Sequence, residues 1–92
     1  MELTVELLGE ARHLARKKEC VIRTEDQLTF RDVLRQVASL SPPLLGSVIV
    51  PETFDLTSSY MLNVDGRHVV KDFDISANDG QRLFLMFLEA GG

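Results

Sequence analysis

The chain has 92 residues, of which 45% are hydrophobic, and a formal net charge of −4 at pH 7. This length suits one domain with a single modest core, and the hydrophobic content excludes wholesale disorder. The negative charge argues against nucleic acid as a partner, and no apolar run approaches the ~18 residues that would predict a membrane span. The N-terminus lacks the basic and apolar regions of a signal peptide, so we expect a cytoplasmic protein without a membrane partner.

Two short strands are predicted at the start of the chain. Residues 2–8 alternate between apolar and polar side chains, which is typical of a half-buried strand, and residues 19–24 are rich in β-branched residues. The connection between them contains a basic cluster, formed by Arg12, His13, Arg16, Lys17 and Lys18. We interpret the cluster either as a solvated connection or as a small docking patch for an acidic partner.

One helix is predicted after the second strand. Thr29 is a suitable N-cap, and Asp32 occupies the third helical position, near the positive end of the helix dipole. Apolar residues then recur at the spacing of one helical stripe: Phe30, Val33, Leu34, Val37 and Leu40. Pro42 and Pro43 end the helix, because proline cannot continue its hydrogen-bond ladder.

The second half of the chain contains a long connection and further strands. Residues 44–58 are an irregular excursion in which residues 48–50 could form a short edge segment. Residues 60–64 and 67–70 form a predicted hairpin around Asp65-Gly66, a pair that suits a type I′ turn. After a turn at Asn78-Asp79-Gly80, residues 82–88 form the last predicted strand.

This order of elements predicts an α+β fold: a mixed sheet of four to five strands with one main helix packed on one face. The first and last strands are strongly apolar, so we expect them to pair in the centre of the sheet. This is the order of a β-grasp, or ubiquitin-like, domain. We assign residues 1–88 to that single domain and residues 89–92 to a flexible C-terminal tail.

The last strand is apolar on both faces, although a single helix covers only one face of the sheet. We place Leu83 and Leu85 under the helix, with Phe87 on the same side. Phe84, Met86 and Leu88 then lie on the open face, where contiguous apolar side chains usually mark a protein interface. Alternatively, residues 44–58 fold over these side chains and cover them.

The chain closes with Glu89, Ala90, Gly91 and Gly92 directly after this strand. Four extended residues span about 13–14 Å, and the two glycines have no side chain to obstruct a narrow channel. The reactive group that such a tail could deliver is the α-carboxylate of Gly92, which can be activated to an acyl derivative.

The chain resembles the ubiquitin-like sulfur carriers, which comprise the small subunit of molybdopterin synthase (MoaD), the thiamine-pathway carrier (ThiS) and related modifiers. Four features carry the resemblance: the segments LTVELLG, LTFRDVL, NVDGR and NDGQRLFLMFLEAGG. It implies that an E1-like adenylyltransferase uses ATP to adenylate the Gly92 carboxylate, and that a persulfide then replaces AMP to leave a thiocarboxylate. The tail would donate this sulfur in a synthase such as the large subunit of molybdopterin synthase. The family's hydrophobic docking surface maps onto Phe84 and Met86.

Three alternatives stay open: a thiamine-pathway carrier, a protein modifier that joins Gly92 to lysine, and a passive β-grasp interaction module. The larger size of the chain favours the molybdopterin type. In each case we expect a carrier or co-substrate that is not an enzyme alone, because the chain has no phosphate-binding glycine loop. We also expect no bound cofactor and no metal site.

Cysteine, histidine and aspartate often act in catalysis, but in this sequence a structural role explains each of them better. Cys20, the single cysteine, is expected to be a small buried hydrophobe, and His13 and His68 to be ordinary surface or strand residues. Asp72 and Asp74 suit turn formation better than acid–base catalysis.

Overall fold

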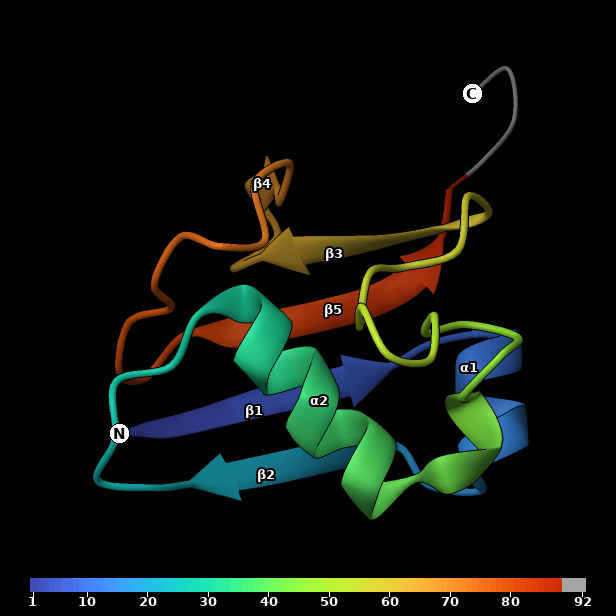
Figure 1. Ribbon diagram of the computed structural model, residues 1–92, viewed down its shortest axis with the longest axis horizontal. Helices are drawn as coiled ribbons and strands as arrows, with labels where there is room; N and C mark the ends of the chain where they lie inside the picture. The colour runs from blue at the N-terminus through green and yellow to red at the C-terminus, as the bar shows by residue number, and fades with distance from the viewer. Residues whose placement is uncertain (89–92) are drawn as a thin grey trace.

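The computed structural model describes residues 1–88, which form a five-stranded sheet in the order β2-β1-β5-β3-β4 (Figure 1). Helix α2 crosses one face of this sheet, so the predicted α+β, β-grasp arrangement is confirmed. The strands are β1 (Glu2–Leu7), β2 (Glu19–Arg23), β3 (Tyr60–Val64), β4 (His68–Val69) and β5 (Arg82–Phe87). The helices are α1 (Glu10–Ala15), α2 (Phe30–Leu40) and the 3-10 turn η1 (Pro42–Leu44). Among residues 1–88, no helix has the length and hydrophobicity needed to cross a membrane.

The first and last strands pair in the middle of the sheet, as predicted. β1 and β5 run parallel, with Val5 opposite Leu83 and Leu7 opposite Leu85. β2 pairs antiparallel with β1, and β3 pairs antiparallel with both β5 and β4. Because β1 and β5 run in the same direction, their C-terminal ends lie at the same end of the sheet, beside α1 (Figure 1).

The hydrophobic core lies between this sheet and α2. Alternate residues of β1 and β5 face inward and are at most 1% exposed, and they share one cluster with the apolar face of α2. The core residues of these three elements are Leu3, Val5, Leu7, Leu83, Leu85, Phe30, Val33, Leu34, Val37 and Ala38. Leu40, the last residue of the predicted stripe, is 48% exposed, because α2 ends there and η1 turns the chain away. The prediction for Leu40 is therefore wrong.

The N-terminus of α2 is closed by the predicted cap. The Thr29 side-chain oxygen accepts a hydrogen bond from the Asp32 backbone N–H (3.1 Å), and the Asp32 carboxylate accepts one from the Thr29 N–H (3.0 Å). This reciprocal pair satisfies two backbone donors that a helix end would otherwise leave free. Because the Thr29 N–H binds the ionised carboxylate, the pKa of Asp32 lies below its usual value.

The hairpin after β3 turns at Asp65-Gly66, where both residues have positive φ angles of 55° and 72°. This conformation is the one that a type I′ turn requires, which explains the Asp-Gly pair. The returning strand is shorter than residues 67–70, because only His68 and Val69 pair with β3.

Residues 44–58 pack on the same side of the sheet as α2. Val48 and Ile49 are fully buried in the core, but residues 48–50 form no strand, and Ile49 makes only isolated bridges to Leu45 and Leu56. The Phe54 ring lies under the guanidinium of Arg35, 5.1 Å from it. The segment therefore covers the helix side and leaves the opposite face of the sheet open.

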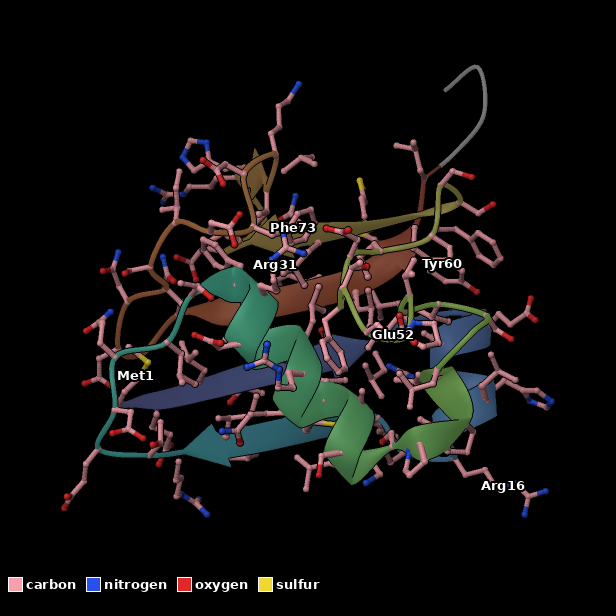
Figure 2. The ribbon with its side chains drawn as sticks, viewed as in Figure 1. Met1, Arg16, Arg31, Glu52, Tyr60 and Phe73 are labelled. Atoms are coloured by element: carbon pink, nitrogen blue, oxygen red, sulfur yellow. The ribbon has the colours of Figure 1, made fainter. Side chains whose placement is uncertain are left out.

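Arg31, in the first turn of α2, ties this segment to a second loop (Figure 2). Its guanidinium donates to the carboxylates of Asp55 (2.6 Å) and Asp74 (2.8 Å) and to the Thr53 carbonyl (2.7 Å). The hydrogen bonds from Arg31 are the main reason that the pKa values of Asp55 and Asp74 lie below their usual range. One residue thus joins three segments that are far apart in the sequence.

Candidate functional site

A shallow groove of about 310 Å³ lies on the open face of the sheet, between β3 and β5. Its lining is mostly apolar, and we call it the apolar groove; the residues are Leu8, Met61, Asn63, Gly66, Phe84 and Met86. Met61 lies directly opposite Met86, and Asn63 lies opposite Phe84. Alternate residues of a strand point to opposite faces, so these side chains point away from the core that their neighbours fill.

Two of the three predicted docking residues line the groove, and the third does not. Phe84 and Met86 are half-buried and occupy its β5 side. Leu88 lies beyond the end of β5 and is 54% exposed; its N–H donates to the Ser59 carbonyl (2.8 Å). Phe87 was expected on the core side, but it is 42% exposed and stacks on the Tyr60 ring at a centroid distance of 4.5 Å, because α2 does not reach this end of the sheet.

Charged residues form the other half of the open face. The Arg82 guanidinium lies 6.0 Å from the centre of the Phe84 ring and forms ion pairs with Glu19 (3.3 Å) and Glu6 (3.8 Å). The open face therefore has an apolar half, on β3 and the later part of β5, and a charged half, on β1, β2 and the start of β5. Such a face suits recognition of another protein, because the apolar half supplies affinity and the charged rim supplies orientation.

Asn63 introduces one polar group into the apolar groove. Its side-chain oxygen is buried and has no hydrogen-bond partner among residues 1–88. A buried polar atom without a hydrogen-bond partner lowers the stability of the fold. Packing alone therefore does not explain why an asparagine occupies position 63.

The groove residues that the sequence analysis did not predict as docking residues are Leu8, Met61, Asn63 and Gly66. A signal for two of them was present, because residues 60–64 were predicted to form a strand. In such a strand Met61 and Asn63 face away from Tyr60, Leu62 and Val64, and those three are buried. The missing information was that β3 pairs with β5, which places the side chains of the two strands next to each other.

The predicted tail residues Glu89, Ala90, Gly91 and Gly92 lie outside the described residues. The structure does describe the point from which they follow. Leu88 follows β5 at the end of the sheet where β1 also ends. At this end the Leu8 N–H donates to the Leu85 carbonyl (3.0 Å). Leu88, the last described residue, therefore lies at the same end of the sheet as Leu8, which lines the apolar groove.

The other residues considered as candidate catalytic residues lie apart from the apolar groove. Cys20 is buried in β2, and its Sγ atom lies 3.8 Å from the Ser41 hydroxyl. His13 and His68 are exposed on α1 and β4, and they do not come together. The Asp72 carboxylate accepts the Asp74 backbone N–H (2.9 Å), as expected of a turn.

A scan against protein-family models finds no match for this sequence, and a search of curated proteins finds no significant match. Solved structures do match. SAMP1 from Haloferax volcanii aligns over 100% of both chains with a TM-score of 0.83 and 16% sequence identity. The HVO 2177 protein from Haloferax volcanii is 26% identical, and the alignment covers 100% of this chain and 87% of that one with a TM-score of 0.76.

A third match comes from a complex of subunits 1 and 2 of the molybdopterin-converting factor from Helicobacter pylori. It aligns over 100% of both chains with a TM-score of 0.59 and 16% identity. The chain has the β-grasp fold of these proteins. The resemblance noted in the sequence is thus confirmed for the fold, and the structural neighbours include proteins of the kind that it named.

Proposed function

We propose that this chain is a sulfur carrier whose Gly92 carboxylate is converted to a thiocarboxylate and used as a sulfur donor. The observation that carries the proposal is the position of the apolar groove. It lies on the open face of the sheet, and the strand that forms one of its sides leads directly into the Gly91-Gly92 ending. A partner that holds Phe84 and Met86 also holds the start of the tail in a defined place.

The chemistry requires activation of the carboxylate by a partner, an E1-like adenylyltransferase. A carboxylate oxygen of Gly92 attacks the α-phosphorus of ATP and displaces pyrophosphate, which gives an acyl adenylate. The terminal sulfur of a persulfide attacks the acyl carbon and displaces AMP. A thiol then cleaves the resulting acyl disulfide, so that the thiocarboxylate leaves and the two thiol sulfurs are joined in a disulfide.

The carrier itself contributes the surface that binds the partner and the tail that reaches the partner's active site. Because ATP and the persulfide belong to the partner, the chain needs no cofactor of its own. Four extended residues reach about 13–14 Å beyond the docked domain, and glycine at the last two positions lets the carboxylate enter a narrow active site.

We further propose that the acceptor synthase belongs to the molybdenum cofactor pathway. The match to a chain of the Helicobacter pylori complex of subunits 1 and 2 of the molybdopterin-converting factor supports this choice, because that chain works in a complex of two subunits. The large subunit of molybdopterin synthase is the corresponding partner expected here, and the cytoplasm is the expected location.

The experiment is an intact-mass measurement of the purified full chain after incubation with an E1-like adenylyltransferase, ATP and a persulfide donor. We expect the C-terminal peptide to gain the mass difference of one oxygen replaced by one sulfur. A variant that lacks Gly92 is the control, and it should fold normally but gain no mass. An unmodified wild-type C-terminus in the presence of an enzyme that modifies its own carrier would refute the proposal.

A protein modifier is the second candidate function, and the match to SAMP1 supports it. SAMP1 is a small archaeal modifier protein. The same adenylated Gly92 would then react with the Nζ amine of a target lysine and form an isopeptide bond with release of AMP. Lysine-linked adducts that end in Gly91-Gly92, found by mass spectrometry in extracts of the source cells, would favour this function over the carrier.

A further inference from the structure

The basic cluster of the sequence becomes a surface hollow in the structure. The hollow has a volume of about 580 Å³, and we call it the basic hollow; its lining residues are Gly9, Arg12, His13, Arg16, Lys17 and Lys18. Arg12 and Arg16 lie one helical turn apart on α1, and the Arg16 N–H donates to the Arg12 carbonyl (2.9 Å). Arg16 then takes a left-handed conformation, with φ of 56°, which turns the chain and brings the two lysines to the same hollow.

The positive charges of this hollow are not neutralised within residues 1–88. Arg23, Arg31, Arg35 and Arg82 each form an ion pair with a carboxylate, whereas the four cations of the hollow form none in this part of the chain. Arg12 and Lys17 donate to the carbonyls of Leu7 (2.9 Å) and Leu40 (3.2 Å), which carry no net charge. The hollow holds four of the chain's ten lysines and arginines and no acid, in a chain with fourteen acidic residues.

The basic hollow and the apolar groove are lined by adjacent residues of the chain. Leu8 lines the groove and Gly9, the next residue, lines the hollow. A Cβ atom added at Gly9 would lie 3.9 Å from the Phe87 ring, so the hollow also adjoins the end of β5. Arg16 extends from this end of the molecule into solvent (Figure 2).

We propose that the basic hollow binds a carboxylate-rich segment of a partner protein, because its cations face no carboxylate among residues 1–88. Apart from Gly9, the hollow is lined by side chains of α1 and of the turn after it. Cations on long side chains around a shallow hollow suit several carboxylates of an extended segment, and such complementary charge orients an encounter between proteins.

The test uses a fluorescent oligo-glutamate peptide and the isotope-labelled full chain. Two double variants receive the same change of charge: Arg16→Glu with Lys18→Glu in the hollow, and Arg67→Glu with Lys71→Glu as the matched control near β4. In the wild-type chain we expect the amide shifts of residues 9–18 to respond to the peptide. Affinity should fall at least tenfold in the hollow variant and less than twofold in the control, and added salt should weaken the binding. A denaturation midpoint for each variant shows that it is folded.

Two results would overturn the inference. One is an equal loss of affinity in both variants, which would mean that the peptide responds to net charge and not to the hollow. The other is displacement of the peptide by pyrophosphate at lower concentrations than by unlabelled peptide, which would identify a phosphate site. Peptide binding should not change when Gly92 is deleted. A failure of thiocarboxylate formation with peptide binding retained would therefore refute the proposed function alone.

Discussion

Adjacent residues of β5 are expected to respond oppositely to truncation, because one faces the core and the next faces the apolar groove. Leu85 is 0% exposed and packs in the hydrophobic core, whereas Met86 is half-buried on the open face. Replacement of a fully buried leucine by alanine costs about 2–5 kcal/mol, since it removes apolar contacts and leaves a cavity. Met86→Ala removes a side chain that water already reaches, so we expect a loss below about 1 kcal/mol.

These differences are large relative to the stability of a small domain. At about 0.05–0.15 kcal/mol per residue, a chain of this length has a free energy of unfolding of about 5–14 kcal/mol. With a urea m-value of about 1.5 kcal/mol/M, a loss of about 3 kcal/mol in Leu85→Ala lowers the unfolding midpoint by about 2 M. The midpoint of Met86→Ala should stay within about 0.7 M of the wild-type value.

Equilibrium urea unfolding, followed by far-UV circular dichroism, measures both midpoints. Leu83→Ala and Phe84→Ala form a second pair with the same geometry and serve as a replicate. If Met86→Ala and Phe84→Ala lower the midpoint as far as the leucine variants do, the open face is part of the core, and the groove is not available for docking.

Three further predictions concern the elements that position the groove and the strands around it. Thr29→Ala removes the cap of α2 and should cost about 1 kcal/mol, measured by urea unfolding at pH 7, with Thr29→Ser close to wild type. The pKa values of Asp55 and Asp74 are lowered in the folded state, so their contribution to stability is complete above the unfolded-state pKa of about 3.9 and is lost as the pH falls through the lower folded values. Arg31→Gln should therefore flatten the fall in stability below pH ~4; an unchanged pH profile would show that the ion pairs do not form in solution. Gly66→Ala places a Cβ atom on a residue with φ of 72° and should cost about 1 kcal/mol, while an unaltered midpoint would contradict the type I′ turn.

Local patterns predicted much of the fold. The alternation in residues 2–8 identified the inward-facing residues of β1, and the period of two placed Leu83 and Leu85 of β5 on the core side, because the side-chain period of a strand is independent of its partners. The Thr29 cap and the Asp65-Gly66 turn were also predictable, since each depends on a few neighbouring residues.

Features that depend on distant residues could not be predicted in this way. Arg31 binds Asp55 and Asp74, which are 24 and 43 residues away, and no local pattern relates the three. The irregular path of residues 44–58 follows from burial of Val48 and Ile49 against a core that forms from other segments.

The candidate site was predicted in part for the same reason. Phe84 and Met86 were found because a strand that is apolar on both faces needs an explanation for its second face. Met61 and Asn63 join them only through the register between β3 and β5. Leu8 joins the groove likewise only through the parallel pairing of β1 with β5.

The central position of β5 also determines when the domain can assemble during synthesis. β1 with β2 and β3 with β4 are two antiparallel pairs, and β5 is the strand that joins them into one sheet. A nascent chain that has not yet released residues 82–87 from the ribosome therefore lacks both the strand that joins the two antiparallel pairs and the β5 side of the apolar groove. Because the groove is completed by the last strand, a partner that recognises it binds only chains in which translation has passed this strand. Docking thereby discriminates against prematurely terminated chains without any contact to the missing residues.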